Sequence, residues 1–378
     1  MAGDEVRILH VVPRIVRRGA EVFAAQLAEA LQPASRNLLF PLFGPDEGAP
    51  AGRVHIVPGA RPAGRVEGRV GVDPGAVARM RAGIRRLRPS LVVAHGGEPL
   101  KYAVLADPRA RVPLAYRKIS HAVGGRGERI LARMYDRTDR IFAVTDELKR
   151  ELVEEFAVDP DRVVVIPTSR KAPPTLRADE RAAVRTGIGA DPDRPLLAWV
   201  GRLSEEKQPG AALQAFALIR SRFGACSLAI CGDGPLRESV EGAAGAAGPG
   251  ALVLGSRDDA ERIIAASDLV LSTSRTEGAP GVLVEAGLAG VPVVAFDVGE
   301  VSQVVRRNET GVLVRPGDLD ALADAACRLL ADPGARERMS AAAREACAPF
   351  ELGAIAARYA AVFADLIGLS GAQLRRLD

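Results

Sequence analysis

The sequence predicts an α/β protein with two doubly wound parallel sheets, and three observations support this fold class. Short apolar runs alternate with amphipathic helical stretches along the whole chain, as in parallel sheets flanked by helices. The chain of 378 residues is longer than one usual domain, and its 48% of hydrophobic residues can fill two cores. A polar segment with several prolines, residues 167–180, indicates a linker between two domains.

The first domain is predicted to begin with a strand and a helix and to alternate up to the linker. Its strands are expected at Val6–Val12, Asn37–Phe43, Val54–Val57, Leu91–His95, Val112–Arg117, Arg140–Val144 and Val163–Ile166. Its helices are expected at Ala20–Leu31, Pro74–Leu87, Glu128–Tyr135 and Asp146–Phe156. Ligands of such sheets bind beyond the carboxyl ends of the strands, so the loops after these strands are the first places to look for a site.

The second domain continues the same alternation. Its strands are expected at Pro195–Val200, Cys226–Cys231, Leu252–Gly255, Asp268–Leu271, Val291–Phe296 and Gly311–Val314. Its helices are expected at Ala260–Ala266, Val282–Leu288 and Leu319–Leu330, with a loop and helix at 297–304 and a helical tail at Glu351–Ile367. Aromatic residues are only 4% of the chain, so both cores must consist mostly of Ala, Val, Leu and Ile.

Basic residues are concentrated in the first part of the chain. Residues 1–170 carry 28 Lys and Arg against 20 Asp and Glu, whereas residues 171–378 carry 23 against 27. The candidate contacts for an anionic partner are arginines of one helix and one loop: Arg79, Arg81, Arg85, Arg86 and Arg88, and Arg61, Arg65 and Arg69. They form either a solvated helix face or a contact with a membrane surface or lipid-linked acceptor. No recognisable binding module accompanies the charge, so nucleic acid is not an expected partner.

The ends and the cysteines indicate a cytoplasmic protein. The first residues, MAGDEVRILHVV, lack the basic and long apolar regions of a signal peptide. No apolar run is long enough to span a bilayer. The four cysteines show neither a CxxC spacing nor the density of a secreted domain. We therefore expect a location in the reducing cytoplasm, with peripheral contact to the inner face of the membrane if the basic residues bind it.

The stretch Ser272–Phe296 concentrates the residues that are suited to bind a ligand. A strand ends in small polar residues, a turn with Glu277 follows, and Pro280 suits the first turn of the next helix. Such a turn aims free backbone N–H groups and the positive end of a helix dipole at one point, which suits an anion. Glu277 and Glu285 add two carboxylates that can accept hydrogen bonds from sugar hydroxyls. The alternative is that Glu277 only caps the helix and Glu285 is solvated.

These residues and the blocks around them resemble the retaining GT-B glycosyltransferases of the large group 1 family (glycosyltransferase family 4-like). The blocks follow the family's order: Gly201-Arg202-Leu203-Ser204-Glu205-Glu206-Lys207, Cys231-Gly232-Asp233-Gly234-Pro235-Leu236, Leu254-Gly255-Ser256-Arg257, the E-x7-E pair Glu277 and Glu285 with Gly278 and Gly281, and Gly290-Val291-Pro292. The resemblance implies a GT-B fold, with two Rossmann-like domains facing an interdomain cleft. It places an acceptor-side domain at 1–170, completed by a C-terminal helix at about 351–378, and a donor-binding domain at 171–350.

The resemblance also implies which residues bind the donor. Arg202 and Lys207 would neutralise the leaving diphosphate, because a strand-to-helix turn holds these two cations on either side of it. Glu277 would hold sugar hydroxyls, and Glu285 would hold ribose hydroxyls. The other donor-binding positions are Gly201, Gly234, Arg257, Gly278, Ala279, Pro280 and Gly281.

The first domain matches the family less closely. The family usually has two glycines after the first strand, whereas here Arg18 stands in the first place and Gly19 in the second. Gly19 is expected to let the donor diphosphate approach the backbone because it lacks a Cβ, and Arg18 could meet a phosphate with its side chain. His121 is the candidate for a catalytic histidine near the donor sugar, and His95 is a second candidate. The alternative for both is a neutral histidine bonded to a neighbouring loop.

We therefore expect a retaining glycosyltransferase of glycan biosynthesis that uses a nucleotide-diphosphate sugar, needs no metal and has no cofactor. Fixed positive charge around the leaving diphosphate would lower the barrier. The acceptor is a glycan, a lipid-linked compound or a small molecule. Three alternatives stay open. One is a GT-B nucleotide-sugar epimerase, which would need no acceptor, and another is a non-catalytic nucleotide-sugar binding protein. A dinucleotide oxidoreductase is disfavoured, because Gly232-Asp233-Gly234 lacks the third glycine of that fingerprint.

Overall fold

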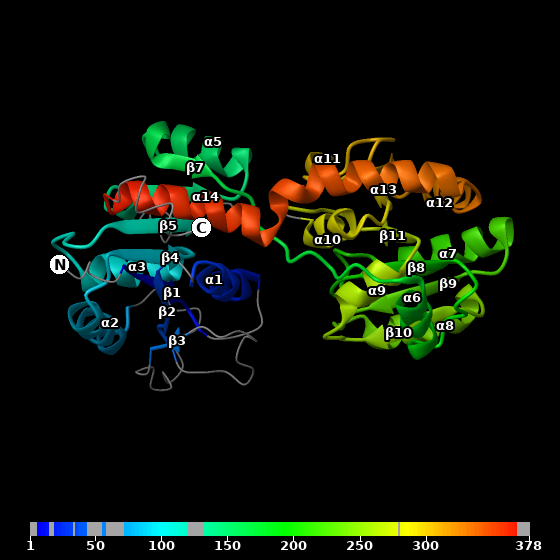
Figure 1. Ribbon diagram of the computed structural model, residues 1–378, viewed down its shortest axis with the longest axis horizontal. Helices are drawn as coiled ribbons and strands as arrows, with labels where there is room; N and C mark the ends of the chain where they lie inside the picture. Colours follow the sequence, from blue (N-terminus) through cyan, green and yellow to red (C-terminus); the bar gives the residue numbers. More distant parts are fainter. Residues whose placement is uncertain are drawn as a thin grey trace. The chain divides into compact units, whose positions relative to one another are not determined.

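The chain divides into two compact units, each built on its own parallel sheet (Figure 1). The computed structural model describes residues 6–14, 19–32, 35–43, 55–57, 72–119, 132–278 and 280–368. The N-terminal unit holds residues 1–169 together with 352–378, and the C-terminal unit holds residues 170–351. The predicted α/β class with two doubly wound sheets is confirmed.

The N-terminal unit has a seven-stranded parallel sheet with the order β3-β2-β1-β4-β5-β6-β7 among its described residues. The strands are β1 Arg7–Val12, β2 Arg36–Pro41, β3 His55–Ile56, β4 Leu91–His95, β5 Leu114–Lys118, β6 Arg140–Ala143 and β7 Val163–Val165. The order reverses between β1 and β4, which pair directly. Each strand predicted for this half is present, with ends that differ by no more than about two residues.

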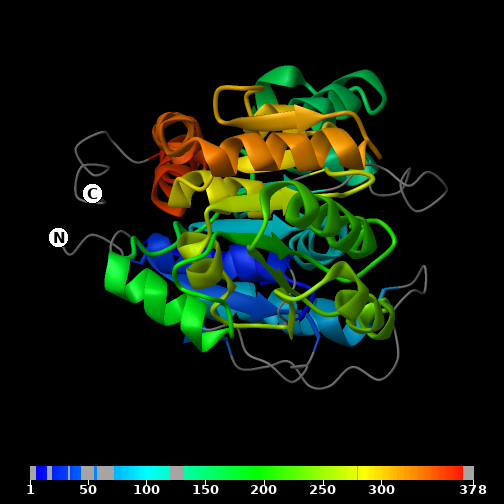
Figure 2. The ribbon, with the colours of Figure 1, turned by 90° about the vertical axis from the view of Figure 1, so that its right-hand side faces the viewer.

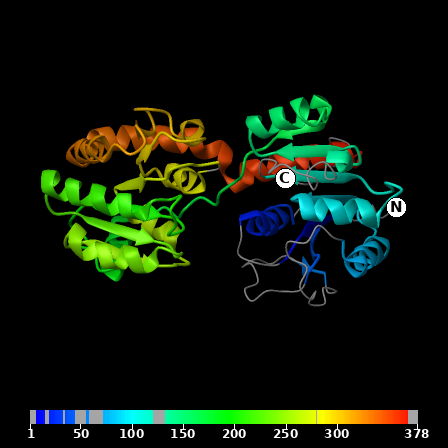
Figure 3. The ribbon, with the colours of Figure 1, turned by 180° about the vertical axis from the view of Figure 1, so that it is seen from behind.

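Helices cover both faces of this sheet (Figure 3). They are α1 Gly19–Ala30, α2 Pro74–Leu87, α3 Gly97–Ala106, α5 Asp146–Glu154 and α14 Leu352–Leu366. α1 and α14 pack on one face, where Phe23, Tyr359 and Phe363 are buried. α2, α3 and α5 cover the other face. The last helix of the chain therefore completes the core that the first strand begins.

Capping residues and the pattern of buried side chains explain why some of these helices were predicted and others were not. α2 has its predicted bounds because Pro74 occupies its first position and the side chain of Asp73 accepts from the N–H of Gly75 at 2.7 Å. α3 was not predicted, because it buries Leu100, Tyr102 and Ala103 around much of its circumference and so lacks a single apolar stripe. Of the helix predicted at 128–135, residues 132–135 are helical, and the rest lie outside the described residues.

The C-terminal unit has a six-stranded parallel sheet with the order β10-β9-β8-β11-β12-β13. The strands are β8 Leu196–Val200, β9 Ser227–Cys231, β10 Ala251–Gly255, β11 Leu269–Ser272, β12 Val293–Phe296 and β13 Gly311–Val314. The order reverses between β8 and β11, which pair at the centre of the sheet. The loops that follow these two central strands therefore lie next to each other at one edge of the sheet.

Helices also cover both faces of the second sheet (Figure 2). They are α6 Ala178–Gly187, α7 Pro209–Phe223, α8 Arg237–Ala247, α9 Ala260–Ala266, α10 Gly281–Ala289, α11 Val301–Val304, α12 Leu319–Ala331 and α13 Pro333–Cys347. α7, α8 and α12 pack on one face, and α9, α10 and α11 pack on the other. Among them, α10 begins directly after the loop that carries Glu277.

The predicted linker at 167–180 is shorter than expected, because α6 already begins at Ala178. The N–H of Arg177 donates to Glu180 at 2.9 Å, which caps the start of the helix. Arg185 then ties the helix to the sheet, with Nη2 at 2.9 Å from Oδ2 of Asp268. The polar composition that suggested a linker therefore belongs partly to a helix held by ion pairs.

Candidate functional site

A cavity of about 160 Å³ lies in the C-terminal unit, beside the loops that follow β8 and β11. This is the carboxyl edge of the sheet at the point where the strand order reverses, which is where open α/β sheets bind ligands. Five of the predicted site residues line it: Gly201, Lys207, Glu277, Pro280 and Gly281. Side chains that were not predicted also line it, among them Arg170, Trp199 and Ser274.

Lys207 and Glu277 form the ion pair at the centre of this lining. Nζ of Lys207 lies 2.8 Å from Oε2 of Glu277, and the Glu277 side chain is only 10% exposed. The hydroxyl of Ser274 donates to the other carboxylate oxygen, Oε1, at 2.6 Å. The carboxylate thus has a charged donor on one oxygen and a neutral donor on the other, and its remaining lone pairs can accept from ligand hydroxyls.

A buried threonine joins the two loops that carry this pair. Thr273 accepts a hydrogen bond from Nε1 of Trp199 at 3.1 Å, and its hydroxyl donates to the carbonyl of Gln208 at 2.9 Å. Gln208 follows Lys207 directly and has a φ of 49°, a backbone conformation that is uncommon outside glycine. Two buried side chains, Thr273 and Trp199, therefore hold the backbone next to Lys207 in place.

A third loop supports the backbone of Glu277. The carbonyl of Glu277 accepts from the N–H of Glu300 at 2.9 Å. Gly299, just before it, has a φ of 51°, and a Cβ at that position would overlap the Glu277 carbonyl oxygen. Only glycine fits here without displacing Glu277.

Glu285 lies on α10 and pairs with Arg170, a residue that the sequence did not indicate. Nε of Arg170 lies 3.4 Å from Oε1 of Glu285. Burial raises the pKa of Glu285, Arg170 opposes the rise, and Glu261 adds to it. The guanidinium of Arg170 also covers Gly281, where a Cβ would overlap it. Arg170 therefore links the start of α10 to the second carboxylate of the E-x7-E pair.

Pro280 and Gly281 form the start of α10 as predicted. Pro280 is the residue before the helix and accepts at its carbonyl from the N–H of Leu283 at 3.0 Å. The N–H groups of Gly281 and Val282, the first two of the helix, have no partner within it and can bind a ligand anion. Gly278 is exposed on the loop before the helix, and Ala279 lies outside the described residues.

Other predicted donor residues do not line the cavity. Arg202 is exposed two residues after β8. Arg257 forms a two-contact ion pair with Asp259 at 2.7 and 2.8 Å, which raises the pKa of the arginine. At Gly234, with a φ of 159°, a Cβ would overlap the carbonyl of Leu203, so the glycine is required by close loop packing.

The remaining predictions concern the N-terminal unit. Gly19 is the first residue of α1. Arg18 and His121 lie outside the described residues, so their roles stay predictions.

His95, the second candidate histidine, lies at the carboxyl end of β4 and is buried inside the N-terminal unit. It is 1% exposed, and its Nε2 lies 3.1 Å from Nδ1 of His10, whose Nε2 lies 3.0 Å from Oδ1 of Asn37. The Asn37 amide is oriented because its Nδ2 donates to the Ser35 carbonyl at 2.9 Å. His10 therefore donates through Nε2 and accepts at Nδ1, and His95 donates to it. Burial lowers the pKa of both rings, that of His10 to about 4, so both stay neutral.

No helix within the described ranges is long and apolar enough to cross a membrane.

The sequence matches two family models. Residues 17–169 match Glycosyltransferase Family 4, and residues 194–332 match Glycosyl transferases group 1. The D-inositol 3-phosphate glycosyltransferase of Nocardia farcinica is 33% identical over 268 residues, which are 66% of this chain and 55% of that protein. The GDP-mannose-dependent alpha-(1-6)-phosphatidylinositol monomannoside mannosyltransferase of Mycobacterium tuberculosis is 30% identical over 272 residues, 66% of this chain and 69% of that protein.

The fold is shared with solved structures at low sequence identity. Anabaena Alr3699/HepE, crystallised in complex with UDP-glucose, has a TM-score of 0.77 and 19% identity, with 96% of this chain and 100% of that chain covered. The match spans about half the length of the first curated relatives, 55% of one and 49% of another.

The two Rossmann-like sheets therefore define a GT-B fold, as predicted. Within that class, the chain belongs to the group 1 glycosyltransferases, with a Glycosyltransferase Family 4 region in its first half.

Proposed function

We propose that this protein is a retaining glycosyltransferase that moves a sugar from a nucleotide-diphosphate sugar to an acceptor hydroxyl. The observation that supports it most directly is the Lys207–Glu277 pair, which lines the cavity where α10 begins. The ammonium of Lys207 suits the diphosphate oxygen of the bond that breaks. The carboxylate of Glu277 suits the sugar on the other side of that bond. The two curated relatives described above are both sugar transferases by name, which favours the same chemistry.

In the proposed reaction, the bond between the anomeric carbon and the diphosphate oxygen breaks, and the diphosphate leaves with the electron pair. Lys207 and the first N–H groups of α10 place positive charge where negative charge develops. Arg202, exposed on the same loop as Lys207, would supply a second cation. This preset charge would do the work of a metal ion in the proposal, so no metal and no cofactor is required.

The two carboxylates would hold the two sugars of the donor. Glu277 already accepts from Lys207 and Ser274, and its free lone pairs would accept from hydroxyls of the transferred sugar. Glu285 would accept from the ribose hydroxyls. Arg170 contacts both Gly281 and Glu285, so we infer that it positions the second carboxylate relative to the phosphate end of the donor. Of these residues, Arg170 is the one that acts only through others.

The acceptor side of the proposal is broader. The acceptor would be a hydroxyl of a glycan, a lipid-linked compound or a small molecule. Its oxygen would bond to the anomeric carbon on the face that the diphosphate leaves, and its proton would pass to the departing diphosphate oxygen, so that the anomeric configuration is retained. Gly19, Arg18 and His121 keep their proposed donor-side roles from the family resemblance. A cytoplasmic location with peripheral contact to the membrane, through the basic N-terminal half, completes the proposal.

Ligand-dependent thermal stabilisation tests the donor class. The wild type and Lys207→Ala are melted with excess UDP-, GDP-, ADP- and TDP-sugars and with NAD(P), because a ligand that binds only the folded state raises the melting temperature. We expect one nucleotide-sugar class to stabilise the wild type strongly and the variant weakly. Proton NMR of the product then checks that the anomeric configuration is retained, and a parallel assay with EDTA checks metal independence.

Each contrary outcome points to a named alternative. Stabilisation by NAD(P) alone would exclude the glycosyltransferase. Conversion of the nucleotide sugar without any acceptor would indicate an epimerase. Binding without turnover over a broad acceptor panel would favour a non-catalytic binding protein.

A further inference from the structure

A second hollow lies on the N-terminal unit and is lined by five arginines. It has a volume of about 490 Å³ and lies between the end of α2 and the loop that joins α3 to β5. The arginines are Arg81, Arg85, Arg88, Arg109 and Arg111. Among its described lining residues, only Asp107 carries a carboxylate. We call this surface the basic hollow.

The basic hollow is separate from the site proposed for the donor. It adjoins the amino ends of β4 and β5, since Pro89 precedes the first of these strands and Val112 precedes the second. Ligands of such sheets bind at the opposite, carboxyl ends. The cavity with Lys207 and Glu277 also belongs to the C-terminal unit, so the two sites share no residue.

The protein neutralises only part of the positive charge in the basic hollow, because five arginines face one carboxylate. The carboxylate of Asp107 accepts from the backbone N–H groups of Arg111 and Val112 at 2.7 and 3.0 Å, so it is occupied in holding its own loop. Arg81 donates to two carbonyls at the end of α3. The other four arginines are exposed, and no hydrogen bond or ion pair of their side chains occurs among the described residues. Like charges gathered around one hollow repel each other, and a bound anion removes that repulsion.

The walls of the basic hollow are held in place by backbone geometry. Arg88 ends α2 with a φ of 46°, and its N–H donates to the carbonyl of Ile84 at 2.9 Å. Ala110, between two of the arginines, also has a φ of 46°. Residues other than glycine keep this conformation only where the surrounding structure imposes it. The end of α2 and the loop before β5 therefore have a fixed backbone conformation without a ligand.

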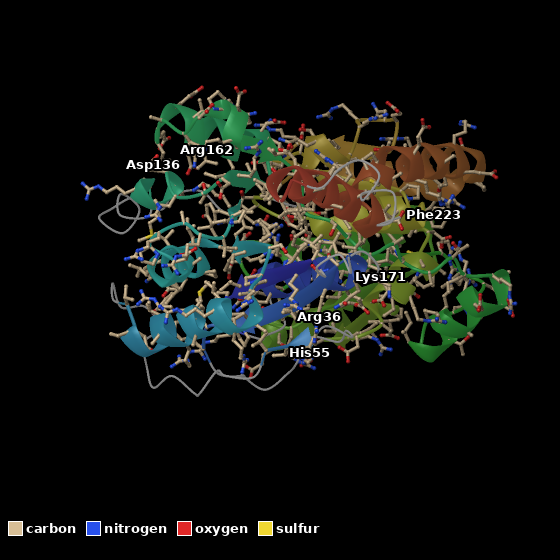
Figure 4. The ribbon with its side chains drawn as sticks, turned by 60° about the vertical axis from the view of Figure 1, so that its left-hand side comes forward. Arg36, His55, Asp136, Arg162, Lys171 and Phe223 are labelled. Atoms are coloured by element: carbon tan, nitrogen blue, oxygen red, sulfur yellow. The ribbon has the colours of Figure 1, made fainter. Side chains whose placement is uncertain are left out.

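Two further arginines, Arg137 and Arg162, hold the loop between α3 and β5 in place. Arg137 donates through Nη2 to the carbonyl of Pro108 at 2.9 Å, next to Arg109. The turn that carries Arg137 is itself held by Arg162, which donates to the carbonyls of Tyr135 and Thr138; Arg162 and Asp136, a residue of this turn, are labelled in Figure 4. The loop with Arg109 and Arg111 is thus anchored to the strands behind it.

We propose that the basic hollow binds a ligand with clustered phosphate groups, either a free polyphosphate-like anion or the phosphorylated head group of a lipid. Guanidinium groups match phosphate oxygens with two parallel hydrogen bonds, and four of them around one hollow can hold more than one phosphate. The inference does not depend on the proposed glycosyl transfer, because none of its residues belongs to that site.

Calorimetric titration with sodium tripolyphosphate tests the inference. All titrations use Lys207→Ala as background, so that phosphate binding at the donor site does not contribute. The test variant adds Arg85→Gln and Arg109→Gln, which remove two charges from exposed side chains. The control variant adds Arg150→Gln and Arg338→Gln, two exposed arginines that line neither site. We expect at least about a tenfold loss of affinity in the test variant and less than twofold in the control, with binding that weakens as salt rises.

Co-sedimentation with vesicles separates the two sources of phosphate. The same variants are mixed with phosphatidylglycerol vesicles and with phosphatidylcholine vesicles. Arginine-dependent binding of tripolyphosphate alone identifies a free anion as the ligand, whereas arginine-dependent binding to the anionic vesicles alone identifies a lipid head group. If neither probe binds, or if both pairs of substitutions weaken binding equally, the proposal is wrong. A separate variant carries Arg85→Gln and Arg109→Gln but keeps Lys207. If a nucleotide sugar still stabilises this variant, a negative result for the basic hollow does not affect the proposal for the donor site.

Discussion

Lys207 and Glu277 come from different loops and form an ion pair with each other. The pair is mostly shielded from water, with side chains 26% and 10% exposed. A diphosphate that enters the cavity would share the ammonium with the carboxylate. The lysine is thus held ready at the point where charge would develop, with little rearrangement needed at the moment of reaction.

Substitution of Lys207 by Ala is expected to lower kcat/KM by about 10²- to 10³-fold, the usual cost of losing one charged donor to a developing anion. Initial rates with the donor identified by thermal stabilisation measure the effect. Lys171→Ala is the matched control, because Lys171 is an exposed lysine of the same unit. Equal losses in the two variants would contradict a specific role for Lys207.

Glu285→Gln is expected to change stability in a pH-dependent way. Burial raises the pKa of Glu285, so its contribution to stability is present at low pH and is lost as pH rises through the folded-state pKa. Glutamine does not ionise, so the variant should gain stability relative to the wild type between pH 5 and pH 8. Denaturant midpoints at both pH values measure this, and a constant difference would argue against it. The substitution also replaces one carboxylate oxygen by an amide nitrogen, so one ribose hydroxyl would lose its acceptor and donor binding should weaken by about tenfold.

The paired histidines should make the N-terminal unit sensitive to acid. The pKa of His10 is lowered from 6.5 to about 4 by burial, so the unfolded chain takes up a proton before the folded one does. Stability is therefore lost as pH falls from about 6.5 towards 4, by about 2 kcal/mol at pH 5 from His10 alone. Hydrogen-exchange protection factors of β1 and β4 at pH 7 and pH 5, which are corrected for the intrinsic pH dependence of amide exchange, check this. Unchanged protection factors at pH 5 would show that the rings are not buried as a neutral pair.

At the scale of elements, the sequence predicted strands better than helices. Buried parallel strands are short, continuous apolar runs, and each one predicted is present. α6 and α13 were missed because few of their residues are buried. In α13 only Met339, Ala343 and Cys347 are buried, and in α6 only Arg185 is. Such helices are stabilised by caps and ion pairs that a hydrophobic pattern does not report.

The loop between β12 and α11 should influence the site although it contributes no side chain to it. Gly299→Ala would force a Cβ against the carbonyl of Glu277 in a left-handed backbone conformation. We expect a loss of about 1–3 kcal/mol in stability and a fall in kcat/KM, because Glu277 must move. Gly317→Ala is the control, since Gly317 has a φ of 81° but no atom within 4 Å of a Cβ. It should lose stability while keeping activity, and equal activity losses would contradict the supporting role of Gly299.

At the scale of the whole molecule, the sequence indicated which positions belong to the candidate site, and five of them line the cavity. It did not indicate which of these side chains contact each other. The resemblance singled out Lys207, Glu277 and Glu285 separately. It did not indicate that the first two pair with each other, because their contact depends on how β8 and β11 lie in the sheet. Arg170 was missed because it lies in a segment that composition marks as a linker. Arg202 and Arg257 carry the family pattern yet point to no shared cavity in the described structure.

Unfolding measurements can test how much α14 contributes to the stability of the N-terminal unit. Phe363 is 2% exposed and contacts the rings of His10, Phe142 and Tyr359. Phe363→Ala should destabilise the N-terminal unit by about 3–5 kcal/mol and leave the C-terminal unit protected from hydrogen exchange. Phe216→Ala, in the core of the other sheet, should do the reverse. Simultaneous loss of protection in both units would show that they unfold together.

The position of α14 also sets the order in which the chain can mature during synthesis. Residues 170–351 are contiguous, so the C-terminal unit has all of its residues as soon as the ribosome has passed them. The N-terminal unit is translated first but lacks α14, one of the two helices on one face of its sheet, until residues 352–366 emerge. The apolar side chains that α14 covers, among them Phe142 of β6, stay uncovered until then, so we expect the N-terminal unit to complete its folding after the C-terminal unit, against the usual N-to-C order.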